Sequence, residues 1–164
     1  VLVATEEEGR GVLSTHLHAD GRYAEMLWGE FESSKHHPRI TEEVIRNGRH
    51  YPAMDGKEVF KHAVSRMPEV AEEALAANGL TIADLDLLIP HQANLRITQM
   101  VQRRLGLADE QVVSNIDRYG NTTAATIPIA LAEAVRAGRV ERGDLLCLVA
   151  FGSGFTWASA LVRW

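Results

Sequence analysis

The chain has 164 residues, of which 46% are hydrophobic, and a formal net charge of -5 at neutral pH. A chain of this length can bury a sizeable core and would normally form one domain. The negative charge argues against a nucleic-acid partner, which needs a basic face, and no apolar run approaches the length of a membrane span. The single cysteine, Cys147, excludes an internal disulfide and suits a reducing compartment, so we expect a cytoplasmic protein.

Two strands are expected near the start of the chain. Residues 1–5 form an apolar run and residues 12–18 a second strand candidate, with the charged, glycine-bearing turn 6–11 between them. His16 and His18 are two residues apart and therefore share one face of their strand, where two histidines could bind a metal. No third ligand has a clear spacing, so we interpret them as hydrogen-bonded strand histidines.

A long helix is expected over residues 56–78, after a segment without sustained periodicity at 19–55. Its apolar residues recur at spacings of three and four, and Gly79 supplies a stop. Pro68 lies within the pattern and is expected to kink the helix. The recurring apolar residues are Val59, Phe60, Ala63, Val64, Met67, Val70, Ala71, Ala74 and Leu75.

The segment 86–89, apolar from Leu87 on, follows a capped turn at 81–84 and leads into Pro90, which favours extended backbone before it. We therefore expect a short buried strand with His91 at its carboxyl end, the edge where ligands bind in open α/β sheets. A helix should then run to Leu105, with Gly106 as its stop. Its expected apolar face is Ala93, Ile97, Met100, Val101 and Leu105.

The rest of the chain predicts one more helix and three strands. A short strand at 112–113 precedes the polar turn 119–123, which should open a helix over 122–137 with a kink at Pro128. Buried strands are expected at 144–151 and 155–162, joined by a glycine turn. Cys147 lies in the first of them, where burial raises the pKa of a thiol and makes it an inert core residue.

Polar groups thus follow several strand ends: His91, Asn121 and the glycine turn 152–154. From the residues alone, three functions stay open. Histidine and asparagine could act together on one ligand oxygen, or Asn121 could orient His91 in a hydrolase of the cysteine type. The protein could also be a non-catalytic module that only binds an acyl group or a carrier.

Five motifs, taken in order, resemble the C-terminal half of β-ketoacyl-[acyl-carrier-protein] synthase III. They are the segments 14–21, 89–94, 119–122, 151–157 and 160–163. The resemblance implies a thiolase-type layered α/β fold, α-β-α-β-α in the whole enzyme, with this chain as its C-terminal half. It also implies that the nucleophilic cysteine lies in an absent N-terminal half, whose end falls within residues 1–18. Thiolases themselves use a second cysteine on the C-terminal turn, which this chain does not have there.

The activity that the resemblance implies is decarboxylative condensation of an acyl-coenzyme A, acetyl-coenzyme A in particular, with malonyl-acyl-carrier protein, which starts fatty-acid synthesis. Loss of carbon dioxide leaves an enolate, and by resemblance His91 and Asn121 donate N–H groups to its oxygen. Gly152, Ser153 and Gly154 would offer backbone N–H groups to a second oxyanion. The family commonly has three glycines here, so Ser153 would keep its backbone donor and point its side chain away. Neither a metal nor a cofactor other than the coenzyme A thioester is implied.

The resemblance also implies contacts with substrates and partners. The residues expected beside the coenzyme A arm are Gly56, Phe60 and Asn94. Those expected to dock the acidic carrier protein are Lys61, Arg96, Arg103 and Arg104. A homodimer is expected, and segment 19–55 should shape the substrate entrance or pack on the other half. Relatives that make polyketide or quinolone starters share the His and Asn pair and remain an alternative.

Overall fold

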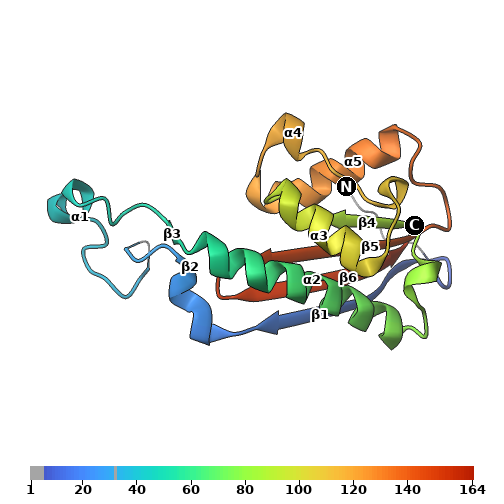
Figure 1. The fold of residues 1–164 in the computed structure, drawn as a ribbon, viewed down its shortest axis with the longest axis horizontal. Coiled ribbons are helices and arrows are strands. Elements are labelled where there is room, and N and C mark those ends of the chain that lie inside the picture. Colours follow the sequence, from blue (N-terminus) through green and yellow to red (C-terminus); the bar gives the residue numbers. More distant parts are fainter. Residues whose placement is uncertain (1–5, 32) are drawn as a thin grey trace.

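A four-stranded mixed sheet in the order β1-β6-β5-β4 forms the centre of the structure, a computed structural model that describes residues 6–31 and 33–164 (Figure 1). The strands are β1 (Gly11–Ala19), β4 (Leu87–Pro90), β5 (Leu145–Gly152) and β6 (Thr156–Arg163). β4 and β5 are parallel, whereas β6 is antiparallel to both of its neighbours. These four strands were expected from the sequence, while residues 1–5 lie outside the described part of the chain.

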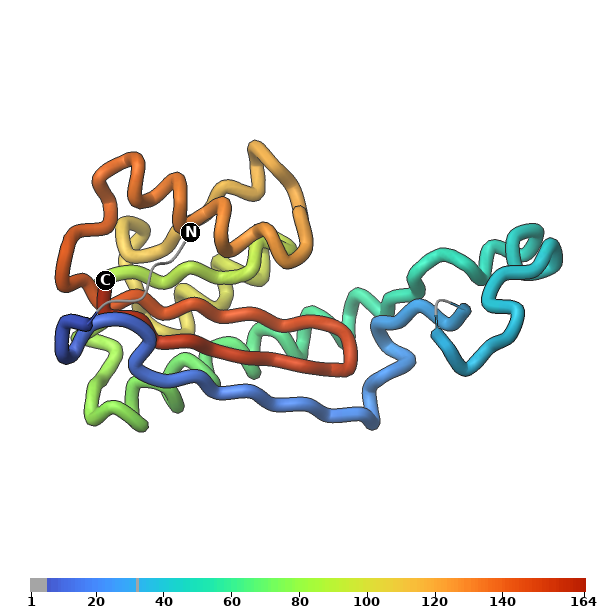
Figure 2. The backbone as a smooth tube through the Cα atoms, turned by 180° about the vertical axis from the view of Figure 1, so that it is seen from behind, coloured from blue at the N-terminus to red at the C-terminus, as the bar shows by residue number. Residues whose placement is uncertain are grey.

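Helices cover both faces of the sheet. They are α2 (Gly56–Ala77), α3 (Leu95–Leu105) and α5 (Thr126–Arg136). Leu145, Cys147 and Val149 of β5 pack in the cluster that includes α2 and α3, whereas Leu146 packs with α5 on the other face. α2 lies in front of the sheet in Figure 1 and behind it in Figure 2. Full burial raises the pKa of Cys147 to about 12, which confirms it as an inert core thiol.

α2 begins and ends where the sequence predicts. The carboxylate of Asp55 accepts hydrogen bonds from the backbone N–H groups of Lys57 and Glu58, both at 3.1 Å, and caps the helix. Gly79 follows the last turn with a φ of +69°, in the left-handed region that favours glycine. Pro68 lies inside the helix and is buried.

α3 differs from the expected apolar face at two positions. Ile97, Val101 and Leu105 are buried, at a spacing of four that forms one stripe facing the core. Met100 is 39% exposed because it lies beside this stripe, and Ala93 precedes the helix and is exposed. The expected inclusion of these two residues in the buried face was therefore wrong.

The helix expected over 122–137 is shorter at its start. Thr123 has a φ of 54°, in the left-handed region, which interrupts any continuous helix from residue 122. A 3-10 turn precedes α5, which begins at Thr126. Pro128 therefore lies in the first turn of α5, where its missing N–H costs nothing, and the predicted interior kink was wrong.

Shorter elements connect these parts. They are η1 (Gly21–Met26), α1 (Glu42–Arg46), η2 (Ile82–Asp84), η3 (Asp109–Gln111), α4 (Ile116–Tyr119) and η4 (Thr123–Ala125). The strand expected at 112–113 reduces to one parallel bridge between Val112 and Leu88. None of the helices within residues 6–31 and 33–164 is long and apolar enough to cross a membrane.

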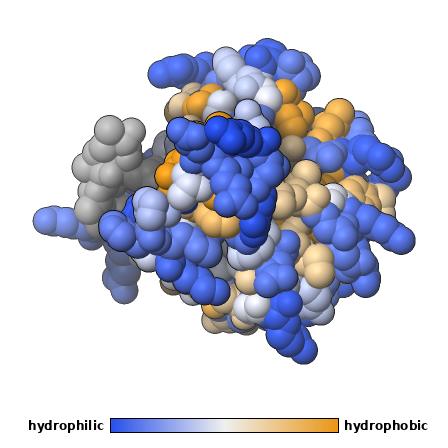
Figure 3. Space-filling view, turned by 90° about the vertical axis from the view of Figure 1, so that its left-hand side faces the viewer, coloured by the Kyte–Doolittle hydropathy of each residue, from blue (hydrophilic) through white to orange (hydrophobic). Residues whose placement is uncertain are grey.

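Residues 27–31 and 33–54 belong to an arm that extends away from the sheet (Figures 1 and 2). Its base is a two-stranded pair of β2 (Leu27–Trp28) and β3 (Ala53–Met54). Val44 of α1 is buried, whereas Ile45 and Tyr51 are 55% and 68% exposed. Figure 3 views the molecule from this side and shows hydrophilic side chains toward the viewer, with hydrophobic ones gathered beside them. The segment is thus partly structured, and its expected role at a substrate entrance stays a prediction.

Candidate active site

His91 follows β4 directly and is held by backbone and side chain. Its backbone N–H donates to the carbonyl of Val149 at 2.8 Å, which extends the pairing of β4 with β5 by one residue. The ring is half-buried, and its Nδ1 lies 2.6 Å from Oγ1 of Thr126. Burial lowers the pKa of His91, because the charged form loses hydration, so the ring is neutral at pH 7.

Gln92 fastens the end of β4 to the next polar segment. Its side chain is fully buried, and its amide nitrogen donates to the carbonyls of Pro90 and Val113 at 2.7 and 3.2 Å. Its amide oxygen accepts the backbone N–H of Asn115 at 3.1 Å. Gln92 therefore fixes the position of His91 relative to the segment that leads to Asn121.

Asn121 lies on an exposed loop after α4, next to Gly120, whose φ of 64° favours glycine. Its Oδ1 accepts the backbone N–H of Thr123 at 2.8 Å. Because the oxygen is engaged, the amide has a defined orientation, and the two N–H groups of Nδ2 remain for a ligand.

Glu133 of α5 anchors α4. Its carboxylate accepts hydrogen bonds from Asn115 Nδ2 at 2.8 Å, from the Tyr119 hydroxyl at 2.6 Å and from both terminal nitrogens of Arg118. These contacts, the Tyr119 hydroxyl foremost, hold the pKa of Glu133 below its usual value. The network fixes the residues immediately before Asn121.

The glycine turn is tied to the end of β1. Phe155 and Asp20 exchange two backbone hydrogen bonds, of 2.9 and 2.8 Å. Gly154 has a φ of +132°, and an added Cβ would lie 2.8 Å from Cγ2 of Thr156, so only glycine fits. Ser153 is exposed, in agreement with a position that tolerates a side chain.

Two cavities meet at His91, Asn121, Phe151 and Gly152. The first has a volume of about 790 Å³ and is lined largely by apolar side chains of β1, β5, β6 and α5, among them Leu17, which is 75% exposed. The second, of about 540 Å³, lies between α2, α3 and the base of the arm. His91 and Asn121 thus face both spaces.

The other predicted site residues divide between these cavities and the surface. Those that line the second cavity are Gly56, Phe60, Asn94 and Arg96. Ser153 lines the first, whereas Gly154 is among the lining residues of neither in the described chain. The guanidinium of Arg96 lies 5.7 Å from the centre of the Phe60 ring, at the same cavity.

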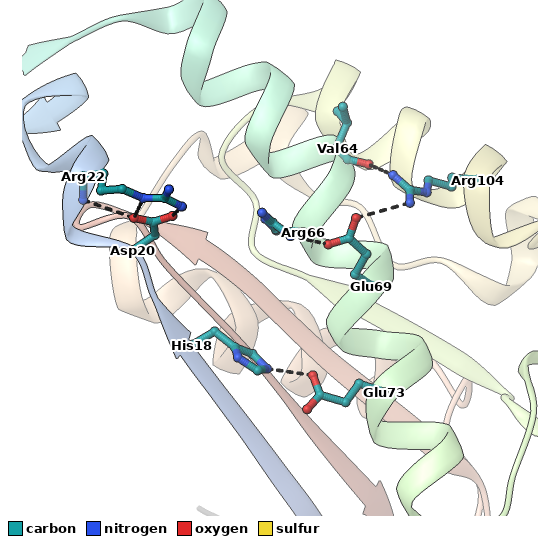
Figure 4. A network of polar contacts seen from close by, with 8 residues as sticks. All are labelled: His18, Asp20, Arg22, Val64, Arg66, Glu69, Glu73 and Arg104. Atoms are coloured by element: carbon teal, nitrogen blue, oxygen red, sulfur yellow. Dashed lines mark hydrogen bonds and ion pairs between the residues drawn. The ribbon is translucent and has the colours of Figure 1, made fainter.

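The remaining basic residues have local partners. Arg104 lies 3.4 Å from the carboxylate of Glu69 and also donates to the carbonyl of Val64 (Figure 4). Lys61 lies 3.4 Å from Glu58, and Arg103 is exposed on the last turn of α3. Their docking role stays a prediction, and the ion pair of Arg104 makes its charge less available than that of Arg96.

His16 and His18 both hydrogen-bond Glu73 of α2, at 3.2 and 2.7 Å. Figure 4 shows the contact of His18 with Glu73. They share one face of β1, and the His18 ring stacks on Trp157 at 5.5 Å. The interpretation of hydrogen-bonded strand histidines is therefore confirmed. The His18 contact is the main cause of the lowered pKa of Glu73.

Sequence reasoning missed three residues that hold the site: Gln92, Thr126 and Glu133. Gln92 adjoins His91 in the motif, and its amide was a visible signal beside the strand end. Thr126 contacts a residue 35 positions away in the sequence, and Glu133 contacts residues 14 and 18 positions away. Sequence spacing gives no signal for contacts over such separations.

Comparison with known proteins identifies relatives along the whole chain. Residues 75–164 match the family model described as 3-oxoacyl-[acyl-carrier-protein (ACP)] synthase III C terminal. β-Ketoacyl-[acyl-carrier-protein] synthase III of Xanthomonas campestris pv. campestris is 52% identical over 163 residues, which are 99% of this chain and 49% of that protein. The chain spans about half the length of the curated relatives it matches.

Solved structures show the same relationship. The synthase III of Thermus thermophilus is 44% identical, with a TM-score of 0.86 over 99% of this chain and 49% of that one. The priming β-ketosynthase of the R1128 polyketide pathway is 34% identical, with a TM-score of 0.77 over 93% of this chain and 45% of that one. The expected thiolase-like α/β fold is therefore confirmed.

Proposed function

This chain belongs to the 3-oxoacyl-[acyl-carrier-protein] synthase III C-terminal family, and on that premise we propose that it supplies half of a condensing active site. The complete enzyme joins an acyl group from acyl-coenzyme A, acetyl-coenzyme A in particular, to malonyl-acyl-carrier protein. The product is a β-ketoacyl-carrier protein, and the reaction begins fatty-acid synthesis. The observation that carries the proposal is the meeting of two cavities at His91 and Asn121.

The geometry at this junction suits a thioester oxygen. Asn121 has its Oδ1 engaged by Thr123, so its N–H groups are directed to other partners, and His91 keeps Nε2 free of described partners. When malonyl loses carbon dioxide, negative charge gathers on the thioester oxygen, and preorganised N–H donors lower the energy of that state. The enolate carbon then attacks the acyl carbon held on cysteine, and the cysteine sulfur leaves as a thiolate.

The two cavities suit two different partners. The second, lined by Gly56, Phe60, Asn94 and Arg96, would admit the long arm of coenzyme A or of the carrier. Arg96, with Lys61, Arg103 and Arg104 farther along the surface, would meet the acidic carrier protein. No metal or further cofactor is required by this chemistry, since the coenzyme A thioester is itself a substrate.

The first cavity is the place for the N-terminal half. It is open and apolar, and Leu17 of β1 lies exposed at its edge. An N-terminal half that covers this side would bring the nucleophilic cysteine to His91 and Asn121, and would supply the acyl pocket. We propose that the working enzyme is cytoplasmic and homodimeric, as the family resemblance implies.

The test separates the two chemical steps in the complete enzyme. Asn121→Ala should lower malonyl decarboxylation by about 10²–10³-fold, the usual effect of removing one oxyanion donor. Acylation of the cysteine by labelled acyl-coenzyme A should survive better. Ser114→Ala, at an exposed residue before Asn115, is the matched control and should change neither step. Equal loss of both steps in Asn121→Ala would contradict this division of labour.

The alternatives make different demands on the same residues. A cysteine hydrolase would need Asn121 bonded to His91, but in the described residues these side chains bond Thr123 and Thr126 instead. The likeness to a priming β-ketosynthase keeps a polyketide starter enzyme as the second candidate. Assay of condensation with carrier proteins of the two pathways distinguishes them. A thiolase-like protein that only binds would release no carbon dioxide with either.

A further inference from the structure

The carboxylate of Glu133, on α5, accepts four hydrogen bonds, two on each oxygen. Its Oε1 accepts from the hydroxyl of Tyr119 at 2.6 Å and from one terminal nitrogen of Arg118 at 2.9 Å. Its Oε2 accepts from Nδ2 of Asn115 and from the other terminal nitrogen of Arg118, both at 2.8 Å. A carboxylate offers about four lone-pair sites, so the donors of segment 115–119 occupy all of them.

Polar contacts, rather than apolar burial, hold α4 in place. The helix has four residues, Ile116–Tyr119, and none of these, all of which the structure describes, is buried. A helix this short is not stable alone in water, so its position depends on tertiary contacts. Asn115 precedes it as the N-cap residue, but its side chain makes no capping bond and donates to Glu133 instead. The position of α4 therefore depends largely on one carboxylate.

The same segment is linked to the strand end that carries His91. Asn115 is 2% exposed, and its backbone N–H donates to Oε1 of Gln92. The amide nitrogen of Gln92 in turn donates to a backbone carbonyl at the end of β4. Through Asn115 and Glu133, this polar bridge continues to α4, which ends two residues before Asn121.

The two catalytic candidates depend on this bridge to different degrees. His91 is also held by its backbone bond to β5 and by Thr126. Asn121 is exposed, and its bond to Thr123 is a local contact that orients the amide but does not position the loop. We infer that Glu133 is a positioning residue, which holds α4 so that the amide of Asn121 reaches the same ligand oxygen as His91. This inference rests on the proposed function.

Glu133→Gln tests this role in the complete enzyme. The amide keeps the shape of the carboxylate, but only its oxygen can accept, so about two of the four donors lose their partner. Malonyl decarboxylation should fall about 10–10²-fold, because misplacing a catalytic group by about 1 Å can cost about 10²-fold. Acylation of the cysteine should change little, since Asn121 is not assigned to that step. Glu141→Gln, at an exposed glutamate in the connection after α5, is the matched control and should change neither step.

A double-mutant cycle shows whether Glu133 acts through Asn121. In an Asn121→Ala background, Glu133→Gln should slow decarboxylation by less than about twofold, whereas losses that multiply would overturn the inference. An equal loss of both chemical steps in Glu133→Gln alone would also overturn it. Tyr119→Phe removes one donor and keeps the carboxylate, so it should give a smaller loss in the same direction. This second variant applies the same cycle if Glu133→Gln fails to fold.

The position of Asn121 supplies a readout that does not depend on activity. In crystal structures of the complete enzyme, the distance between Nδ2 of Asn121 and Nε2 of His91 should change in Glu133→Gln and stay the same in Glu141→Gln. An unchanged distance in Glu133→Gln would overturn the inference. A changed distance together with normal decarboxylation in Asn121→Ala would instead refute the proposed function and leave the positioning role of Glu133 intact.

Discussion

Replacing Gln92 with leucine should remove much of the stability of the fold. The change deletes a buried amide that makes three hydrogen bonds, and leaves the carbonyls of Pro90 and Val113 and the N–H of Asn115 without their partner. Each orphaned buried group costs about 1–3 kcal/mol. The larger apolar side chain returns about 1–2 kcal/mol through burial. Three such groups together cost about 3–9 kcal/mol, so the net loss should be about 4–5 kcal/mol, a large part of the usual stability of about 5–15 kcal/mol.

Urea unfolding followed by circular dichroism measures this loss as a shift in the midpoint at constant slope. Gln99→Leu is the matched control, since Gln99 is an exposed glutamine on α3, and its effect should stay within about 0.5 kcal/mol. The reasoning fails if Gln92→Leu costs less than about 1 kcal/mol. Such a result would mean that water or a backbone shift satisfies the three groups.

Three further outcomes are expected. Charge reversal at Arg96 should raise the Michaelis constant for the carrier substrate more than reversal at Arg104, because Glu69 already pairs with Arg104; equal effects would contradict this. Cys147 should resist alkylation in the folded protein and react only on unfolding, since burial raises its pKa to about 12. Burial lowers the pKa of His91 below the value of about 6.5 that it has in the unfolded chain. The folded protein therefore loses stability as pH falls below this value, because the unfolded chain binds the proton more readily. His91→Gln should reduce this loss between about pH 7 and pH 5, which urea unfolding at the two pH values measures.

The sequence predicted the regular elements better than the irregular ones. α2 and the four strands have apolar patterns that depend only on local spacing, so their positions follow from residue order. The start of α5 does not follow from residue order, because the left-handed backbone conformation of Thr123 interrupts a segment whose composition favours a helix. Met100 shows the same limit, since its exposure depends on how α3 rotates against α2.

The site was predictable as far as single residues at strand ends. His91 and Asn121 each carry such a signal, and the structure brings both to the same two cavities. The residues that hold them do so through contacts made across the fold, such as those of Thr126 and Glu133. Residue type indicates that such a side chain can form hydrogen bonds, but only the packing of α5 determines its partner residues.

The two residues that hold His91 and the segment before Asn121, Thr126 and Glu133, lie on the same helix, α5. Thr126 and Glu133 are seven residues apart, about two helical turns, so they project from nearly the same side of the helix. One contacts the ring of His91, and the other holds α4 before Asn121. A small shift of α5 would therefore carry both catalytic candidates in the same direction. The distance between His91 and Asn121 would then change little, even when both residues move relative to the sheet.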